Sequence, residues 1–130
     1  IAKNSNHKKT KGNNEKYKFL EFNIDGFTVL VGKSNKQNDE LTLKIASKND
    51  IWFHTQKIHG SHVILRTENK QVQNGTLIKC AKLAAKHSKA KLSNNIPVDY
   101  TFVKYVKKPA SSKPGMVIYT NYKTLFVNII

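Results

Sequence analysis

The stretch that decides the fold spans residues 50–66 and has the sequence DIWFHTQKIHGSHVILR. Residues 51–56 and 61–66 are rich in β-branched and aromatic side chains and flank the short segment 57–60, so they predict two paired strands. Successive side chains of a strand point to opposite faces. One predicted face carries Ile51, Phe53, Val63 and Leu65, and the other carries Trp52, His54, His62 and Arg66.

The residues before this stretch predict a β-hairpin and a short helix. Residues 17–23 and 27–31 have strand composition and flank Ile24-Asp25-Gly26, in which Asp-Gly is a strong hairpin signal. After a polar loop at 32–37, Asn38 or Asp39 can cap a helix that runs to Ser47. The inward-facing residues of this helix are expected to be Leu41, Ile45 and Ala46.

The residues after this stretch predict a long helix at 75–92, which is dense in Ala, Leu and Lys. At 100° per residue, four lysines fall within about 80° of one another and form a ridge above an apolar footing. The ridge lysines are Lys79, Lys82, Lys86 and Lys89, and the footing residues are Leu77, Ala81 and Ala84.

The C-terminal part predicts a strand at 98–107, a turn-rich segment at 108–115, and a terminal hairpin formed by residues 116–120 and 124–128. Together these elements predict an α+β fold. We expect a single compact domain that is mainly an antiparallel sheet, with one long basic helix and a shorter helix.

Length and composition agree with one soluble domain. The chain has 130 residues, of which 38% are hydrophobic, and no apolar run approaches the roughly 18 residues that a membrane span needs. We expect residues 1–16 to be a basic flexible linker and residues 17–130 to form the domain. Because the sequence starts at Ile1, it is expected to be part of a longer protein. The single cysteine, Cys80, cannot form an internal disulfide, which favours the cytoplasm over an oxidising compartment.

The charge balance points to an anionic polymer as the partner. Lys and Arg number 23 against 8 Asp and Glu, which gives a net charge of +15. Arg66 is the one arginine, and lysine suits contact with phosphates better than bidentate recognition of bases. The alternative is that a lysine-rich composition reflects solubility or codon usage and forms a solvated face.

The sequence carries no strong signature of catalysis. His54, His59 and His62 lie close together, but their spacing matches neither a zinc finger nor a metalloprotease helix. Ser61 and His62 are neighbours in a predicted strand and so point to opposite faces, and no phosphate-binding glycine loop occurs. We therefore expect no enzyme activity, no catalytic residue, no metal and no cofactor. An enzyme with a metal or an activated nucleophile stays a weaker alternative.

Basic residues interleaved with aromatic ones are typical of RNA-binding surfaces. Trp52, Tyr119 and Tyr122 are candidate stacking platforms for bases. The competing interpretation is core packing, which is favoured for at least part of Trp52 and strongly for Phe53.

Four stretches together resemble the NFACT-R family, the RNA-binding domain at the C-terminal end of bacterial NFACT proteins and their archaeal and eukaryotic relatives. They are DGFTVLVGK at 25–33, NDELT at 38–42, DIWFH at 50–54 with GSHVI at 60–64, and VDYT at 98–101 followed by KKP at 107–109 and KPG at 113–115. The resemblance covers residues 17–128. His59 departs from the pattern, since proline is expected there in many relatives.

The resemblance implies an RNA-binding domain of a ribosome-associated quality-control factor. Such a factor binds the obstructed large ribosomal subunit and tRNA, and supports C-terminal alanine tailing of stalled nascent chains. The expected partners are rRNA, tRNA and the remaining NFACT domains of a longer chain, with no membrane. Because bacterial relatives are also labelled fibronectin- or fibrinogen-binding proteins, the alternative is a surface adhesin module.

The candidate RNA-binding residues combine exposed lysines with the motif residues. They are Lys33, Trp52, His54, Ser61, His62, Lys79, Lys82, Lys86, Lys89, Lys107, Lys108, Lys113 and Lys123.

Overall fold

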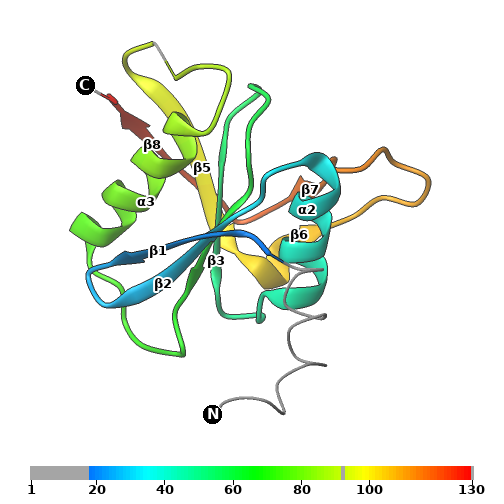
Figure 1. The fold of residues 1–130 in the computed structure, drawn as a ribbon, viewed down its shortest axis with the longest axis horizontal. Helices are drawn as coiled ribbons and strands as arrows, with labels where there is room; N and C mark the ends of the chain where they lie inside the picture. The colour runs from blue at the N-terminus through cyan, green and yellow to red at the C-terminus, as the bar shows by residue number, and fades with distance from the viewer. Residues whose placement is uncertain (1–17, 92, 130) are drawn as a thin grey trace, which may run out of the picture.

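A six-stranded antiparallel sheet organises the chain (Figure 1). The computed structural model describes residues 18–91 and 93–129; the predicted linker at 1–16 lies outside this range. The strands of the sheet stand in the order β1 (Leu20–Ile24), β2 (Phe27–Val31), β4 (Val63–Arg66), β3 (Ile51–Thr55), β5 (Ile96–Phe102) and β8 (Lys123–Val127). The predicted α+β fold with a mainly antiparallel sheet is confirmed.

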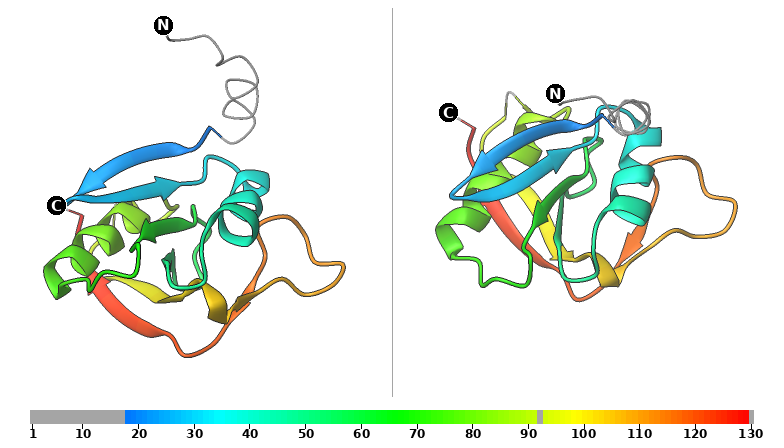
Figure 2. Two further views of the ribbon diagram at one scale, coloured as in Figure 1. Left: turned by 90° about the horizontal axis from the view of Figure 1, so that it is seen from below. Right: turned by 60° about the horizontal axis from the view of Figure 1, so that its bottom comes forward.

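Both faces of the sheet are covered (Figure 2). Helix α3 (Asn74–Lys86) packs on one face. The other face meets α2 (Asn35–Glu40), the π-helical turn Leu41–Ile45, and a small second sheet of β6 (Val106–Lys107) and β7 (Ile118–Tyr119). A sheet buried on both faces explains why the strands at 51–66 are almost continuously apolar.

The predicted alternation of faces is confirmed in the two core clusters. Under α3, the core contains Ile51, Phe53, Val63 and Leu65 together with Leu77, Ala81 and Ala84 of the helix. On the opposite face, Trp52 and Ile64 pack with Leu30, Leu41 and Val106. The small alanines let α3 lie close to the sheet, because a larger side chain there would hold the two apart.

The hairpin of β1 and β2 forms at the predicted Asp-Gly turn. Asp25 has a φ of 53° and Gly26 a φ of 89°, so both central residues adopt positive φ, as a type I′ turn requires. An aspartate tolerates this conformation better than most residues, and glycine has no Cβ to oppose it.

The first helix begins earlier than predicted. Ser34 is its N-cap, and the Ser34 hydroxyl accepts a hydrogen bond from the backbone N–H of Gln37 at 3.1 Å. Asn38 was expected to cap the helix, but its side chain is buried and bonds elsewhere in the fold. The predicted inward residues are confirmed, since Leu41 is buried and Ile45 and Ala46 are partly buried.

Helix α3 ends at Lys86, six residues before the predicted end at Leu92. The chain turns because residues 87–89 pair with another segment: Ser61 N donates to His87 O at 3.0 Å, and Lys89 N donates to His59 O at 2.9 Å. Lys89 therefore lies outside the helix. The predicted ridge is reduced to Lys79, Lys82 and Lys86, which are exposed on α3.

The predicted C-terminal hairpin is wrong. Strand β7 pairs with β6, and β8 pairs with β5. The predicted strand 98–107 is also divided, because a 3₁₀ turn at Val103–Tyr105 carries the chain from the large sheet into the small one. Thr101 holds the return segment, since its hydroxyl contacts the carbonyl oxygens of Thr120 at 2.9 Å and Asn121 at 3.2 Å. In the part of the chain described, no helix has the length and apolar character needed to cross a membrane.

Candidate nucleic-acid interface

The motif residues 38–42 and 60–62 meet inside the fold and hold one surface loop in place. The Asn38 Oδ1 atom accepts a hydrogen bond from His62 N at 3.1 Å, and the Thr42 hydroxyl lies 2.8 Å from His62 Nδ1. Asn38, Thr42 and His62 are each buried. Buried polar groups that satisfy one another in this way fix a single geometry, so the loop at 57–61 stands on a rigid base.

Gly60 allows this loop to touch the segment that follows α3. A Cβ at Gly60 would lie 2.8 Å from the Cβ of Ser88, closer than real side chains approach. Gly60 and Ser88 form an isolated β-bridge. The bridge brings Lys89 from the end of the helix to the side of the loop.

Two adjoining cavities flank this loop, with volumes of about 250 Å³ and about 820 Å³. Both cavities are lined by Ser34, Asn35, His59 and Gly60. Lys33 and Lys89 line the smaller cavity, and Lys36, Lys57 and Lys113 line the larger one. None of the described residues that line either cavity is acidic. We call these two cavities with their five lysines the basic groove.

Asp39, which follows the groove residue Asn38 in sequence, is paired with a lysine. Asp39 Oδ2 lies 3.4 Å from the Lys108 ammonium group, and Asp39 Oδ1 accepts from Gly115 N at 3.0 Å. The Lys108 ammonium group also donates to the carbonyl oxygens of Lys113 at 2.5 Å and Met116 at 3.1 Å. Lys108 was predicted to bind phosphate. The structure instead uses it to hold the 108–116 loop, which leaves Lys113 exposed at the groove.

Trp52 forms the wall beneath the groove and is 0% exposed, so it cannot serve as a stacking platform. Its ring lies 4.5 Å from that of Tyr119 and 5.7 Å from that of His54, measured between centroids. The Tyr119 hydroxyl donates to Asp99 Oδ2 at 2.6 Å, and burial raises the pKa of Tyr119 well above its usual value. Tyr122 is 49% exposed and, of the three predicted platforms, is the one open to solvent.

The two motif histidines differ in exposure, since His62 is buried and His54 is half-buried at the larger cavity. His54 Nε2 donates to the carbonyl oxygen of Gly60 at 3.2 Å, and burial lowers the pKa of His54. Burial also lowers the pKa of His62 to about 3. The predicted RNA contact by His62 is therefore corrected, since this side chain is 1% exposed and carries no charge at neutral pH.

The remaining predicted lysines lie outside the groove. Lys79 is paired with Asp25 at 2.7 Å, and this hydrogen bond lowers the pKa of Asp25. Lys82 and Lys86 are exposed on α3, Lys107 is exposed on β6, and Lys123 is exposed on β8. The structure thus gathers Lys33, Lys89 and Lys113 with the motif residue Ser61, and leaves the other lysines spread over the surface.

Sequence reasoning missed Lys36, Lys57 and His59 as groove residues. Lys57 and His59 lie between the two halves of the DIWFH and GSHVI motif, so their position in the loop was a usable signal. Lys36 gave no signal of its own, because its approach to the loop depends on the Asn38–His62 hydrogen bond.

No cluster of three or more His, Cys, Asp or Glu side chains among residues 18–91 and 93–129 could hold a metal ion. The Cys80 thiol is buried, and burial raises its pKa to about 12. A thiol in that state is a poor nucleophile at neutral pH.

Five lysines and no carboxylate among the described lining residues give the groove a positive field, which attracts anionic polymers. Residues 16–121 match the family model described as the NFACT protein RNA binding domain. The chain belongs to this family. Because the family model describes an RNA-binding domain, membership supports an RNA partner in general terms.

Known relatives extend this result. The chain is 49% identical over 102 residues to the Rqc2 homolog RqcH of Bacillus subtilis, covering 78% of this chain and 18% of the relative. It is 34% identical over 76 residues to an archaeal Rqc2 homolog of Methanocaldococcus jannaschii, covering 58% of this chain and 11% of the relative. It spans about a fifth of the length of the bacterial relatives.

A solved structure has the same fold. The C-terminal part of the fibronectin/fibrinogen-binding protein from Streptococcus suis superposes with a TM-score of 0.80 at 42% sequence identity. The match covers 85% of this chain and 45% of that one.

Proposed function

We propose that this chain is the RNA-binding domain of a cytoplasmic ribosome-associated quality-control factor. In this proposal the factor binds the obstructed large ribosomal subunit and tRNA, and supports C-terminal alanine tailing of stalled nascent chains. The domain anchors the longer protein on rRNA or tRNA and performs no chemical step itself. The observation that carries the proposal is the basic groove, in which five lysines and no acidic residue line two adjoining cavities.

The charge pattern favours contact with the RNA backbone. Lysine ammonium groups are compact point charges that bind phosphate without the planar fork that reads a guanine edge. Each phosphate that the groove neutralises releases condensed counterions, so affinity must fall as the salt concentration rises. The buried bonds of His62 support the backbone of the 57–61 loop with Lys57, and the Lys108 ammonium group holds the 108–116 loop with Lys113. Both lysines are therefore in position before RNA arrives, which reduces the entropic cost of binding.

A double charge reversal tests the groove. We expect Lys57→Glu with Lys113→Glu to lower affinity for a 12-nucleotide single-stranded RNA by at least about tenfold at 0.1 M salt. The slope of the logarithm of the association constant against the logarithm of the salt concentration should become less steep by about 1.4. The reason is that two phosphate contacts are lost, each of which contributes roughly 0.7 for a single strand. Fluorescence anisotropy across a salt series measures both.

The matched control is Lys44→Glu with Lys48→Glu, since both lysines are exposed and line neither cavity of the groove. The control has the same net charge as the groove variant. Equal losses of affinity in the two variants would show that the overall field binds RNA and that the groove does not. A salt-independent affinity of the unaltered chain would contradict the proposal as a whole.

The RNA partners within a ribosome are tested by ultraviolet crosslinking of the longer protein in cells. We expect reads that map to large-subunit rRNA and tRNA, and a loss of these reads in the Lys57→Glu, Lys113→Glu variant. Reads spread evenly over messenger RNA would contradict the ribosomal assignment.

The structural similarity to a fibronectin/fibrinogen-binding protein favours an adhesin module as the second candidate. A net charge of +15 binds many acidic surfaces, so weak, salt-sensitive adhesion is not evidence for this role. The adhesin hypothesis predicts saturable binding to immobilised fibronectin that survives 0.5 M salt. It also predicts that the groove variant binds fibronectin as well as the unaltered chain does.

A further inference from the structure

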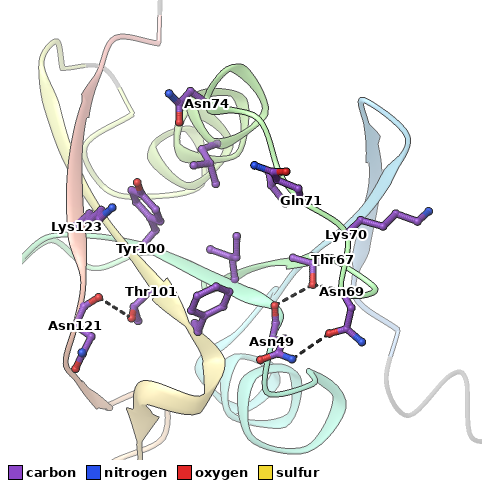
Figure 3. Close-up of a pocket in the computed structure, with 14 residues that line it drawn as sticks. Asn49, Thr67, Asn69, Lys70, Gln71, Asn74, Tyr100, Thr101, Asn121 and Lys123 are labelled. Atoms are coloured by element: carbon purple, nitrogen blue, oxygen red, sulfur yellow. Dashed lines mark hydrogen bonds between the residues drawn. The ribbon is translucent and has the colours of Figure 1, made fainter.

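A separate cavity of about 510 Å³ lies between the start of α3, strand β5 and strand β8 (Figure 3). It shares no lining residue with the basic groove. Asn74, the first residue of α3, lines this cavity, whereas His87 and Lys89, just beyond the end of α3, line the groove. The helix has 13 residues, so the two sites lie about 20 Å apart along it.

The lining of this cavity is rich in side-chain amides. Five of them converge on it from different segments of the chain, namely Asn49, Asn69, Gln71, Asn74 and Asn121. Neither a carboxylate nor a histidine is found among the described residues that line it. An amide offers both donors and acceptors without charge, so this lining suits a neutral polar ligand with edges of both kinds.

Three of these five side-chain amides have no hydrogen-bond partner in the described part of the chain. Asn49 Nδ2 donates to Asn69 Oδ1 at 3.0 Å. The side-chain amides of Gln71, Asn74 and Asn121 make no hydrogen bond to another residue in the described part of the chain. In Figure 3, Gln71 and Asn74 lie around the same space as Tyr100. Their donors and acceptors are therefore available to a ligand.

Aromatic rings supply a flat surface beside the amides. Phe102 lines the cavity and is 42% exposed, and the Lys104 ammonium group lies 5.4 Å from the centre of its ring. The Tyr100 ring is held against Phe53, with centroids 5.7 Å apart and planes 23° from parallel. Lys70 and Lys123 are exposed at the cavity and come from opposite sides of it (Figure 3). Lys70 also lies 3.4 Å from the Glu68 carboxylate, an exposed pair that a phosphate can replace.

We propose that this cavity binds one unstacked nucleobase of a single-stranded RNA. The base edge meets the amides of Gln71 and Asn74, which lie at the same end of the cavity (Figure 3), and its face packs on Phe102. Lys123 and Lys70 contact the flanking phosphates. Side-chain amides match the donor and acceptor groups of base edges, and stacking on an aromatic ring is tolerant of base identity.

The proposal adds a second contact to the basic groove and rests on the RNA-binding function proposed above. The exposed lysines Lys79, Lys82 and Lys86 lie on α3 between the two sites. A strand of RNA that leaves the groove can follow these lysines to the cavity. A peptide ligand would use the amides equally well but gives no reason for two lysines at the edges.

Nuclear magnetic resonance of the 130-residue chain tests the site directly. We expect adenosine, guanosine, cytidine and uridine 5′-monophosphates to shift the side-chain amide signals of Gln71 and Asn74 in a saturable manner. Ribose 5-phosphate at the same concentrations should leave these signals in place. Equal shifts from ribose 5-phosphate would overturn the proposal, because a phosphate alone would then explain the binding. Shifts produced by a short uncharged peptide and not by nucleotides would overturn it as well.

Two substitutions separate a base contact from a general charge effect. Gln71→Glu should weaken nucleotide binding about tenfold, whereas Gln73→Glu should change it less than about threefold. Gln73 is exposed, lies two residues away and does not line the cavity, so the two variants have equal net charge. Phe102→Ala should weaken binding by a similar factor through lost stacking. Equal effects of Gln71→Glu and Gln73→Glu would overturn the proposal.

The same variants distinguish this inference from the proposed function. If the Lys57→Glu, Lys113→Glu pair weakens RNA binding while Gln71→Glu and Phe102→Ala do not, the groove stands and the base site is wrong. If the unaltered chain binds mononucleotides at the amides but binds no single-stranded RNA, the proposed RNA-binding function fails while the base site remains.

Discussion

At the scale of single residues, the family motifs act mainly from inside the protein. Asn38, Thr42 and His62 are buried and bond to one another, and they position the exposed residues of the 57–61 loop. Two exposed groove lysines lie beside or within the motifs: Lys57 stands between DIWFH and GSHVI, and Lys113 is the first residue of KPG. Removal of a buried partner here leaves an unsatisfied polar group, which costs roughly 1–3 kcal/mol.

His62 makes the stability of the domain depend on pH. Its pKa is about 3 in the fold and 6.5 when the side chain is free. Between these values the unfolded chain binds a proton that the folded chain does not, so stability falls as the pH drops below 6.5. We expect a loss of about 2 kcal/mol in the free energy of unfolding between pH 6.5 and pH 5 from this residue. Urea denaturation at a series of pH values measures the loss.

The variants His62→Gln and His59→Gln form a matched pair for this prediction. His62→Gln should be less stable at neutral pH but should lose much less stability on acidification. His59 is exposed, so His59→Gln should keep the pH dependence of the unaltered chain. An unchanged slope in His62→Gln would show that another group, such as the half-buried His54, carries the effect.

At the scale of elements, α3 connects the two candidate sites. Its buried side is made of small residues, with Cys80, Ala81, Ala84 and Ala85 against the sheet. Its exposed side carries Lys79, Lys82 and Lys86, of which Lys79 is paired with Asp25 at the β1–β2 turn. The hydroxyl of Thr76 donates to the same carboxylate at 2.6 Å, so the hairpin turn anchors the first part of the helix. Lys82 and Lys86 stay exposed on the later part of the helix.

Charge reversal on this helix tests its part in RNA binding. We expect Lys82→Glu with Lys86→Glu to lower affinity for single-stranded RNA about three- to tenfold without unfolding the domain. The loss should be smaller than that of the groove variant, because these lysines line neither cavity of the basic groove. Anisotropy measures the affinity, and far-ultraviolet circular dichroism checks the fold. Unchanged affinity in a folded variant would remove α3 from the interface.

At the scale of the whole molecule, a sheet with a hydrophobic core on each face carries a large excess of positive charge. The sheet is buried by α3 on one face and by α2 with the β6–β7 sheet on the other. The chain has a net charge of +15, and the exposed lysines of its described part repel one another. This repulsion weakens the compact state at low ionic strength and attracts an anionic polymer at the same time.

Salt should therefore act on stability and on RNA affinity with opposite signs. We expect the melting temperature of the free chain to rise by several degrees between 0.02 M and 0.3 M sodium chloride, because screening reduces lysine repulsion. Differential scanning calorimetry without RNA measures this. A melting temperature that falls with salt would show that favourable ion pairs outweigh the repulsion.

Local patterns in the sequence predicted the elements whose contacts are close along the chain. The Asp-Gly turn, the alternation in 51–66 and the apolar side of α3 all follow from the nearest few residues, and the structure confirms them. The family was also visible in the sequence, because its motifs occur in order over most of the chain.

Contacts between distant residues decided the rest. The Asn38 side chain bonds to His62 and does not cap α2. Residues 59–61 pair with residues 87–89, and α3 ends before them. The Thr101 hydroxyl bonds to the segment that precedes β8, and β8 pairs with β5 instead of forming a terminal hairpin. The same kind of contact buried Trp52, engaged Lys108 and gathered five lysines around one loop. Local sequence sets which residues are charged and which are apolar. Which charges end up side by side depends on hydrogen bonds across many residues of separation, and these form only when the chain is folded.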